Sequence, residues 1–456
     1  MQTEEQTAQK RERKMPPTRV LALGFAVMIL MGALLLRLPI SWAKGQSLSF
    51  LDALFTATSA TCVTGLSVVE TGLFFSRFGQ TVILLLIQAG GLGFMTMASL
   101  VFMVMGRRIT LRERMLIKES LNEDRLSGMV RLVRWALAMS FCVELAGAVL
   151  LSFRFVPAYG WSDGLFFSLF HAVSAFCNAG FDLLGQGSSM TPYAGDWLVN
   201  LTLMMLITVG GLGYGVVHEM VRKRRFSKLG LHSRLVLLST LWLTVIGFVG
   251  ILMLEWSNPA TLGGKAPGDK LLGAMFQSVT LRTAGFATMD QGAMSPAAKL
   301  LSCILMFIGA SPASTGGGIK TTTFVVAALW AFKVSQGHER VVMMKRALPK
   351  TLVRRAAVVL LIGMGLVMAD ILILSIAEQG HTADTLDVMF EAVSAFATVG
   401  LSCSVTPNLS PMGKMVIILT MFVGRVGPLT LTMAIARRQS RMSERIKYPE
   451  ERIMIG

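Results

Sequence analysis

The chain has 456 residues, of which 53% are hydrophobic and 15% are charged, and its mean hydropathy is +0.61. This composition excludes an ordinary soluble protein, because several apolar runs reach the roughly 20 residues that cross a bilayer core. The formal net charge of +17 would suggest nucleic acid binding in a soluble protein. Its distribution along the chain favours a membrane protein with no nucleic-acid partner.

Basic residues concentrate in alternate segments between the apolar runs. The segments 1–20, 107–134, 222–234, 333–355 and 437–456 carry 32 of the 43 Lys and Arg residues. The intervening segments 41–80, 154–197, 256–299 and 378–414 carry 8. The positive-inside rule therefore predicts a multi-pass protein in the lipid bilayer with both termini in the cytoplasm.

Long and short apolar segments alternate along the chain. A helix of about 12 residues is roughly 18 Å long and cannot span a bilayer, so each short segment predicts a re-entrant pore helix. The spanning runs are 20–40, 78–105, 133–155, 197–218, 235–255, 297–332, 356–377 and 413–436, and the short segments are 49–60, 164–176, 270–281 and 386–397. The sequence predicts an all-α integral membrane protein with eight transmembrane helices, built from four pseudo-repeated helix–pore loop–helix units around a central pore.

These segments divide the chain into four repeats and two tails. The cytoplasmic tails are 1–19 and 438–456. The repeats are 20–106, 107–220 with its preceding cytoplasmic loop, 221–332 with a gate loop at 309–323, and 333–437.

Each short segment ends in a related motif that closes with a glycine, at Gly65, Gly180, Gly285 and Gly400. A ring of backbone carbonyls can replace the hydration shell of K⁺, and glycine allows the positive φ that turns carbonyls toward an axis. The C-terminal ends of the short helices would add partial negative charge. We predict a K⁺ filter made mainly of backbone carbonyls from Val63, Thr64, Gly65, Asn178, Ala179, Gly180, Thr283, Ala284, Gly285, Thr398, Val399 and Gly400. The alternative is four packing glycines in membrane hairpins.

A glycine-rich break follows each filter motif. The expected helix-breaking glycines, at positions 90, 210, 309 and 424, lie 25, 30, 24 and 24 residues beyond the filter glycines. The third break also contains Pro312, Gly316, Gly317 and Gly318. Broken backbone at membrane depth is tolerated only where protein buries it or where it lines a cavity. We predict a gate loop beneath the filter, with a structural kink as the alternative.

Two basic residues are assigned to the same gate. Arg425 lies within the last return run, where a charge is costly and indicates function. It would repel cations at a constriction or bind backbone carbonyls of the gate loop. Lys320 would join it, or would extend to the cytoplasmic face. Glu144 and Asp370 lie within apolar runs and are expected to pair within the helix bundle.

Nucleotide and metal sites find no support in this sequence. The Gly-Gly-Leu-Gly segments and residues 315–321 lack the βαβ context or the Gly-Lys-Ser/Thr spacing of phosphate loops. The five cysteines have no metal-ligand spacing. We expect no organic cofactor, with K⁺ as the transported ion and Na⁺ as an open second ion.

Several motifs together resemble the Trk/Ktr/HKT superfamily of K⁺- and Na⁺-translocating subunits, most closely its bacterial Ktr branch. They are residues 51–60, 88–93, 314–320, 424–431 and 446–450. The resemblance implies K⁺ uptake across the bacterial inner membrane by a homodimer with one pore per subunit. It also implies regulation by a cytosolic KtrA-like ring of RCK nucleotide-binding domains, which this chain lacks.

The same resemblance bears on ion selectivity. Family members with glycine at all four filter positions favour K⁺, whereas serine in the first unit goes with Na⁺ selectivity, so Gly65 implies K⁺. Pro312 departs from the family's gate-loop pattern. No residue locates a Na⁺ dependence or symport.

Two other functions remain open from the residues alone. A Na⁺ or NH₄⁺ pore would use the same architecture. An integral-membrane enzyme would need clustered catalytic groups, whereas the five histidines, at 171, 218, 232, 338 and 381, are dispersed. We therefore expect that the chain is not an enzyme.

Overall fold

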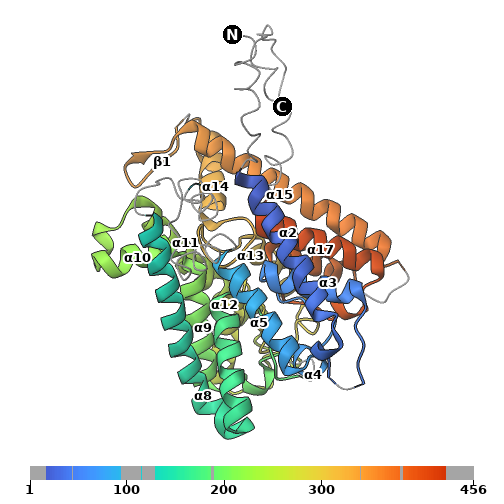
Figure 1. The fold of residues 1–456 in the computed structure, drawn as a ribbon. Helices are drawn as coiled ribbons and strands as arrows, with labels where there is room; N and C mark the ends of the chain where they lie inside the picture. Colours follow the sequence, from blue (N-terminus) through green and yellow to red (C-terminus); the bar gives the residue numbers. More distant parts are fainter. Residues whose placement is uncertain are drawn as a thin grey trace, which may run out of the picture.

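The computed structural model describes residues 17–43, 45–93, 115, 129–185, 189–338, 340–379 and 384–427, and most of them are helical (Figure 1). The helices are α2 (Pro17–Leu36), α3 (Phe50–Cys62), α4 (Thr71–Phe74), α5 (Arg77–Leu92), α8 (Met129–Phe176), α9 (Trp197–Leu212), α10 (Tyr214–Lys223), α11 (Leu231–Glu255), α12 (Pro267–Thr280), α13 (Pro296–Phe307), α14 (Thr321–Ser335), α15 (Lys350–Ala377), α16 (Thr385–Ala397) and α17 (Pro411–Val426). Short 3₁₀ turns are η1 (Pro39–Ser41), η2 (Thr191–Tyr193), η3 (Phe226–Lys228) and η4 (Thr406–Asn408). Strands β1 (Val342–Met343) and β2 (Arg346–Ala347) form an antiparallel pair with Val342 opposite Ala347.

Within the described residues, four helices are long and apolar enough to cross a membrane, namely α2, α8, α11 and α15. A fifth span results if α9 and α10, which are bent by 100° at their junction, are taken together. The helices α5, α13 and α14 are apolar but shorter. The described residues therefore do not confirm the expected eight spans, because glycines interrupt the return segments and two of these segments continue beyond the described residues. The predicted residues 94–105 and 428–436 lie outside the described part of the chain.

Four times along the chain, a long helix is followed by a short helix. The short helix α3 contacts α2 and α5, α12 contacts α11, and α16 contacts α15 and α17. In the second case a kink at Gly160 (φ +81) divides α8 into a long helix and the short one. Each short helix buries a phenylalanine completely, and these residues are Phe55, Phe170, Phe276 and Phe390.

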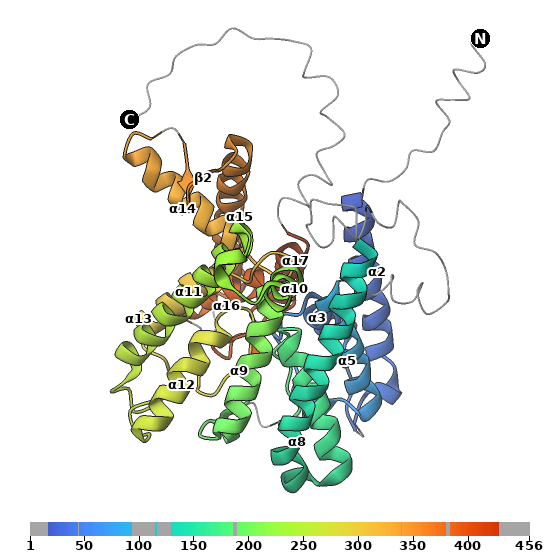
Figure 2. The ribbon, with the colours of Figure 1, turned by 90° about the vertical axis from the view of Figure 1, so that its left-hand side faces the viewer.

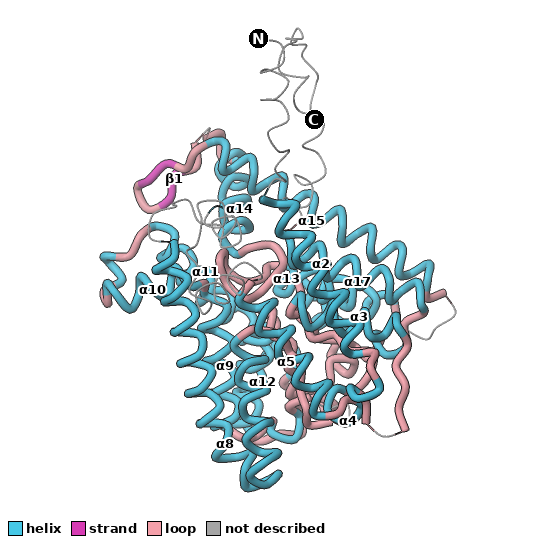
Figure 3. Tube along the Cα trace, in the orientation of Figure 1, coloured by secondary structure: helices cyan, strands magenta, loops and turns pink. Residues whose placement is uncertain are grey.

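These groups of helices form a closed ring. The helix α5 contacts α8, α9 contacts α12, α13 contacts α16, and α17 returns to contact α3. Figure 2 shows the blue, green, yellow and red parts of the chain in separate sectors. Loop segments lie in the interior between the helices (Figure 3). The chain therefore brings the ends of its short helices together near the middle of the molecule.

The return helices end three residues later than the sequence analysis expected. Gly90, Gly210 and Gly424 lie inside helices, and the breaks fall at Gly93, Gly213 and Gly427, whose φ values are +84, +91 and +91. A Cβ on any of the three internal glycines would lie only 1.9–2.0 Å from a carbonyl oxygen of a short helix, at Thr61, Phe176 and Phe396 respectively. These glycines thus allow close helix packing. These three breaks were predicted wrongly because close packing and helix termination both select glycine, whereas the third return helix, α13, ends at Phe307, close to the expected break at Gly309.

Ion pairs join neighbouring groups near the helix N-termini. Arg77 of α5 pairs with Asp163 of α8. Lys299 of α13 lies 2.6 Å from Asp387 of α16, and Lys414 of α17 lies 2.6 Å from Asp52 of α3. The helix α9 contains no Lys or Arg. Lys299 and Lys414 each lie four residues after the N-cap of their helix, and in α9 that position is occupied by Asn200. Within the described residues, the junction between α9 and α12 therefore has no such pair.

Replacing Lys414 with methionine should lower the free energy of unfolding by about 1–3 kcal/mol, because the change leaves a largely buried Asp52 carboxylate without its cation. The side chains of the pair are only 17% and 22% exposed. Thermal unfolding in detergent measures the loss, and adding Asp52→Asn should restore part of it. Lys223→Met breaks a more exposed pair with Glu219, so its loss should stay near about 0.5 kcal/mol. Equal losses would contradict a structural role for the Lys414 pair.

Candidate functional site

The four short helices all end in the same backbone conformation. The residue two positions before each glycine has a positive φ, and these residues are Val63 (58°), Asn178 (60°), Thr283 (70°) and Thr398 (51°). The left-handed region is uncommon for residues other than glycine, and for a β-branched residue it indicates a conformation imposed by its surroundings. The glycines themselves follow with φ between +69° and +96°. The chain therefore turns sharply at each of the four sites.

The backbone N–H groups of these turns bond back to the short helices. Thr64 donates to the Ser59 carbonyl at 2.8 Å, and Gly65 donates to the Ser59 hydroxyl at 3.0 Å. In the fourth turn, Val399 donates its N–H to the Ser394 carbonyl at 2.8 Å, and Gly400 donates to the Ser394 hydroxyl at 3.1 Å. In the second and third turns the hydroxyls act as donors instead. The Ser174 hydroxyl donates to the Phe181 carbonyl at 2.8 Å, and the Thr280 hydroxyl donates to the Phe286 carbonyl at 2.6 Å. Each turn is therefore held by a hydroxyl group from its own short helix.

The carbonyl groups of the turns have no such partners. Within the described residues, no hydrogen bond is accepted by the carbonyl oxygens of the twelve residues predicted for the filter. Most of these residues are completely buried by protein. Buried backbone carbonyls are nearly always paired with protein, water or a ligand. The turns therefore offer a set of oxygens that the described residues leave without a hydrogen-bond partner.

The four turns form a ring of close neighbours. A Cβ added at Gly65 would lie 2.4 Å from the Ala179 oxygen, and one at Gly180 would lie 2.7 Å from the Cα of Gly285. A Cβ at Gly285 would lie 2.5 Å from the Val399 oxygen, and one at Gly400 would lie 1.9 Å from the Thr64 oxygen. The structure thus brings all twelve predicted filter residues together at one place. At each glycine no side chain fits without displacing the next turn.

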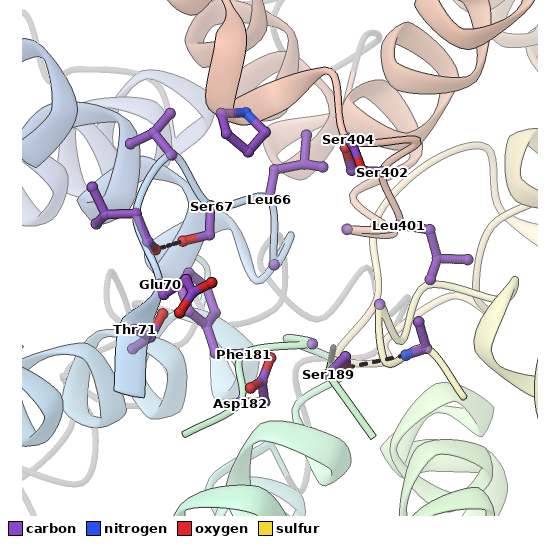
Figure 4. Close-up of a pocket in the computed structure, with 18 of the residues that line it drawn as sticks. Leu66, Ser67, Glu70, Thr71, Phe181, Asp182, Ser189, Leu401, Ser402 and Ser404 are labelled. Carbon is purple, nitrogen blue, oxygen red and sulfur yellow. Dashed lines mark hydrogen bonds between the residues drawn. The ribbon is translucent and has the colours of Figure 1, made fainter. Parts of the chain in front are cut away.

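A cavity of about 370 Å³ opens on one side of this ring, and all four glycines line it (Figure 4). Glu70 and Asp182 contribute carboxylates to its wall. Burial raises the pKa of the Asp182 carboxyl to about 6, although backbone N–H donation from Leu184 and Gly185 opposes the rise, and the nearby Glu70 adds to it. Above that pH the cavity wall gains a negative charge that attracts cations.

The apparent affinity for external K⁺ should therefore fall by about threefold between pH 7 and pH 5, because Asp182 becomes neutral as the pH drops through about 6. Uptake measured against external K⁺ at a series of pH values tests this. The Asp182→Asn variant should show the low-pH affinity throughout and lose the dependence. A variant that keeps the full pH dependence would assign it to another group.

The segment between α13 and α14 lies against the opposite side of the ring. Its ends are joined by a parallel bridge between Ile308 and Ile319. Within it, Gly317 donates its N–H to the Thr398 hydroxyl at 3.0 Å, and the Thr315 hydroxyl donates to the Phe176 carbonyl at 3.3 Å. The predicted gate residues also pack closely here, since a Cβ added at Gly316, Gly317 or Gly318 would lie 2.2, 2.3 or 3.1 Å from an atom of Thr283, Thr398 or Ala397 respectively.

This segment is also held from the sides. Tyr214, the first residue of α10, donates its N–H to the Ala313 carbonyl at 2.9 Å. Ser311 and Thr315 donate to Gly211 and Gly210 at the end of α9, at 3.2 and 3.3 Å. The break between α9 and α10 thus provides the free carbonyl and N–H groups that bind the loop.

Two cations bind carbonyl groups of the same segment. Arg425 donates to the carbonyls of Thr315 and Gly90, with a longer bond of 3.4 Å to Gly91. Lys320 donates to the Gly316 carbonyl at 2.6 Å, so its side chain turns inward and does not extend to the cytoplasmic face. The structure therefore places two basic side chains against the backbone of this segment.

Sequence reasoning missed the supports of this site. The serines at 59, 174 and 394 recur in three of the four aligned motifs, and that recurrence was a usable signal. The left-handed conformation at Val63 had no signal, because valine does not favour it. Glu144 does pair within the bundle, where it accepts two hydrogen bonds from the Gln88 amide at 3.0 and 3.2 Å.

The sequence also has clear relatives. It matches the TrkH family, described as cation transport protein, over residues 10–446. The chain belongs to this family. The resemblance to the Trk/Ktr/HKT superfamily is thereby confirmed, and this TrkH-family protein is a multi-pass membrane cation transporter and not an enzyme.

Individual relatives are similar over almost their whole length. The chain is 46% identical to Ktr system potassium uptake protein B of Bacillus subtilis (strain 168), over 96% of this chain and 97% of that protein. It is 39% identical to the potassium/sodium uptake protein NtpJ of Enterococcus hirae, over 98% and 99%. The crystal structure of the potassium transporter TrkH from Vibrio parahaemolyticus superimposes with a TM-score of 0.73 at 19% identity, covering 95% of this TrkH-family chain and 87% of that one. At that identity the likeness supports the fold.

Proposed function

We propose that this protein carries K⁺ into the cell across the inner membrane through a selectivity filter of backbone carbonyls. One observation supports the filter above all others. The four turns pack against one another, and none of the twelve carbonyl oxygens of the predicted filter residues accepts a hydrogen bond within the described residues. A dehydrated K⁺ is a ligand that replaces those missing partners, because rings of carbonyls substitute for its water shell.

The architecture proposed around this filter is the predicted one. Four helix–pore loop–helix units surround a central pore, with unit boundaries near residues 106, 220 and 332. Pseudo-fourfold placement of the short helices directs four C-terminal ends, each with partial negative charge, at the same region. Both termini face the cytoplasm, in agreement with the distribution of Lys and Arg.

Residues 309–323 are proposed as the gate of this pore. The loop contacts the filter turns through Gly317 and Thr315, and Arg425 and Lys320 bind its carbonyls. Displacing the loop would move its backbone and the Lys320 side chain away from the filter and would break its hydrogen bond to Arg425, which lies on α17. In this position the loop is held by the Thr398 and Arg425 side chains of the fourth unit and by backbone groups of the second unit.

Partners follow from the relatives. Proteins named Ktr system potassium uptake protein B occur among them, at 46% and 40% identity, and a system implies another subunit. We propose a homodimer that binds a cytosolic KtrA-like ring of RCK domains through the basic cytoplasmic segments. The relative named for potassium and sodium uptake favours a second candidate, in which Na⁺ accompanies or replaces K⁺.

Rb⁺ uptake into proteoliposomes that contain this chain alone tests the proposal. Uptake that K⁺ inhibits and Na⁺ does not would support the filter. Equal inhibition by both ions would favour the Na⁺ candidate. If uptake is absent, the assay is repeated with the cytosolic ring added, and continued absence of uptake contradicts the proposed function.

A further inference from the structure

The left-handed residues at the four turns direct their side chains at different neighbours. In the first unit the residue is Val63, which has no hydrogen-bonding group. Asn178, Thr283 and Thr398 occupy the same position in the other three units, and all three are completely buried. The side-chain amide of Asn178 lies 3.1 Å from the Thr283 hydroxyl. Polar side chains thus follow the ring on the side where the gate loop lies.

The glycines of the gate loop fit against these side chains. A Cβ on Gly316 would lie 2.2 Å from the Thr283 hydroxyl oxygen, and one on Gly317 would lie 2.3 Å from the Thr398 hydroxyl oxygen. Only glycine lets the backbone approach so closely. That approach brings the Gly317 N–H to 3.0 Å from the Thr398 oxygen, which is the one hydrogen bond that the loop makes with the filter segment of the fourth unit within the described residues.

We propose that Thr398 is a gate-positioning residue, whose hydroxyl accepts the Gly317 N–H and thereby holds the gate loop closed against the filter. This inference rests on the proposed filter and gate, and it assigns the side chain of Thr398 a role separate from that of its carbonyl. A buried N–H without its acceptor is costly. Losing the hydroxyl therefore makes the closed position less stable relative to an open one, where water can satisfy the N–H.

The first unit shows which substitution of Thr398 the turn should tolerate. Val63 already adopts φ +58° at the equivalent position, close to the +51° of Thr398. Valine has the same shape as threonine, so Thr398→Val should keep the turn while removing the hydroxyl. Thr398→Ser keeps the hydroxyl and should restore the contact. Thr288→Val is the matched control, because Thr288 is completely buried and its hydroxyl has no partner within the described residues.

The test measures the initial rate of Rb⁺ uptake in proteoliposomes, in the native chain and in a chain that lacks residues 313–318. In the native chain, Thr398→Val should raise the rate about fivefold, equivalent to about 1 kcal/mol or one net hydrogen bond. Thr398→Ser keeps the hydroxyl and should raise the rate less than Thr398→Val does, whereas Thr288→Val should stay near the native rate. In the deleted chain, Thr398→Val should cause no further change, because its partner is gone.

The outcomes separate this inference from the proposed function. A deletion that raises flux while Thr398→Val does not would overturn the role of Thr398 and leave the gate in place. Equal effects of Thr398→Val in both backgrounds would also overturn it, since the hydroxyl would then act on the filter alone. No effect of the deletion on flux would contradict the proposed gate itself.

Discussion

Replacing Gly65 with serine should reduce the preference for K⁺ over Na⁺ by about tenfold, or about 1.4 kcal/mol. A Cβ at this position would lie 2.4 Å from the Ala179 oxygen, and φ is +96°. The first turn must therefore shift, and the Ala179 carbonyl must move with it. Carbonyl placement decides how well the ring replaces the water shell of K⁺, so selectivity should suffer more than expression.

Inhibition of Rb⁺ uptake by K⁺ and by Na⁺ measures this change. Gly160→Ser is the matched control, because Gly160 also has a positive φ, +81°, but a Cβ there meets nothing within 4 Å. Both variants incur the cost of an unfavourable φ, of about 1–3 kcal/mol, whereas only Gly65→Ser crowds the ring. An unchanged ion preference in Gly65→Ser would count against the filter.

Deleting residues 313–318 should raise the rate of uptake by about tenfold or more, which corresponds to about 1.4 kcal/mol in the gating equilibrium. The deletion removes the carbonyls that Arg425 and Lys320 bind. It also removes the Gly317 N–H from the Thr398 hydroxyl. Initial Rb⁺ uptake, normalised to the amount of reconstituted protein, measures the effect.

A point substitution gives a milder form of the same test. Gly317→Ala places a Cβ 2.3 Å from the Thr398 hydroxyl oxygen and should push the loop off the filter, with a smaller increase in flux. Gly264→Ala is the control, since a Cβ there meets nothing within 4 Å. Reduced flux with normal expression in the deleted chain would instead identify the loop as a packing element.

Much of this architecture could be predicted because its signals repeat. Four glycine motifs at near-equal spacing identified the twelve residues that the structure brings into one ring. Helix length separated short helices such as α3 and α16 from spans such as α11. The family resemblance, carried by motifs such as residues 88–93, was confirmed by the comparisons.

The remaining features depend on contacts that one sequence does not display. Gly90 and Gly93 look alike in the sequence, yet one lies against the Thr61 carbonyl and the other ends the helix. The inward turn of Lys320 depends on a carbonyl that only the folded loop presents. The conformation of Val63 opposes its own preference, so only the surrounding fold could reveal it.

The ion pair between Asp52 and Lys414 has a consequence for biosynthesis. The two residues are 362 positions apart in the chain, and the pair links the first short helix to the last described helix. After α3 has been synthesised and inserted, nearly the whole remaining chain must be translated before Lys414 reaches the membrane. Within the described residues, the other side chain that hydrogen-bonds to the Asp52 carboxylate is the neighbouring Ser49. Packing of α17 against α3 is therefore the step that closes the ring of helices. A chain that stops before α17 would leave α3 without this neighbour.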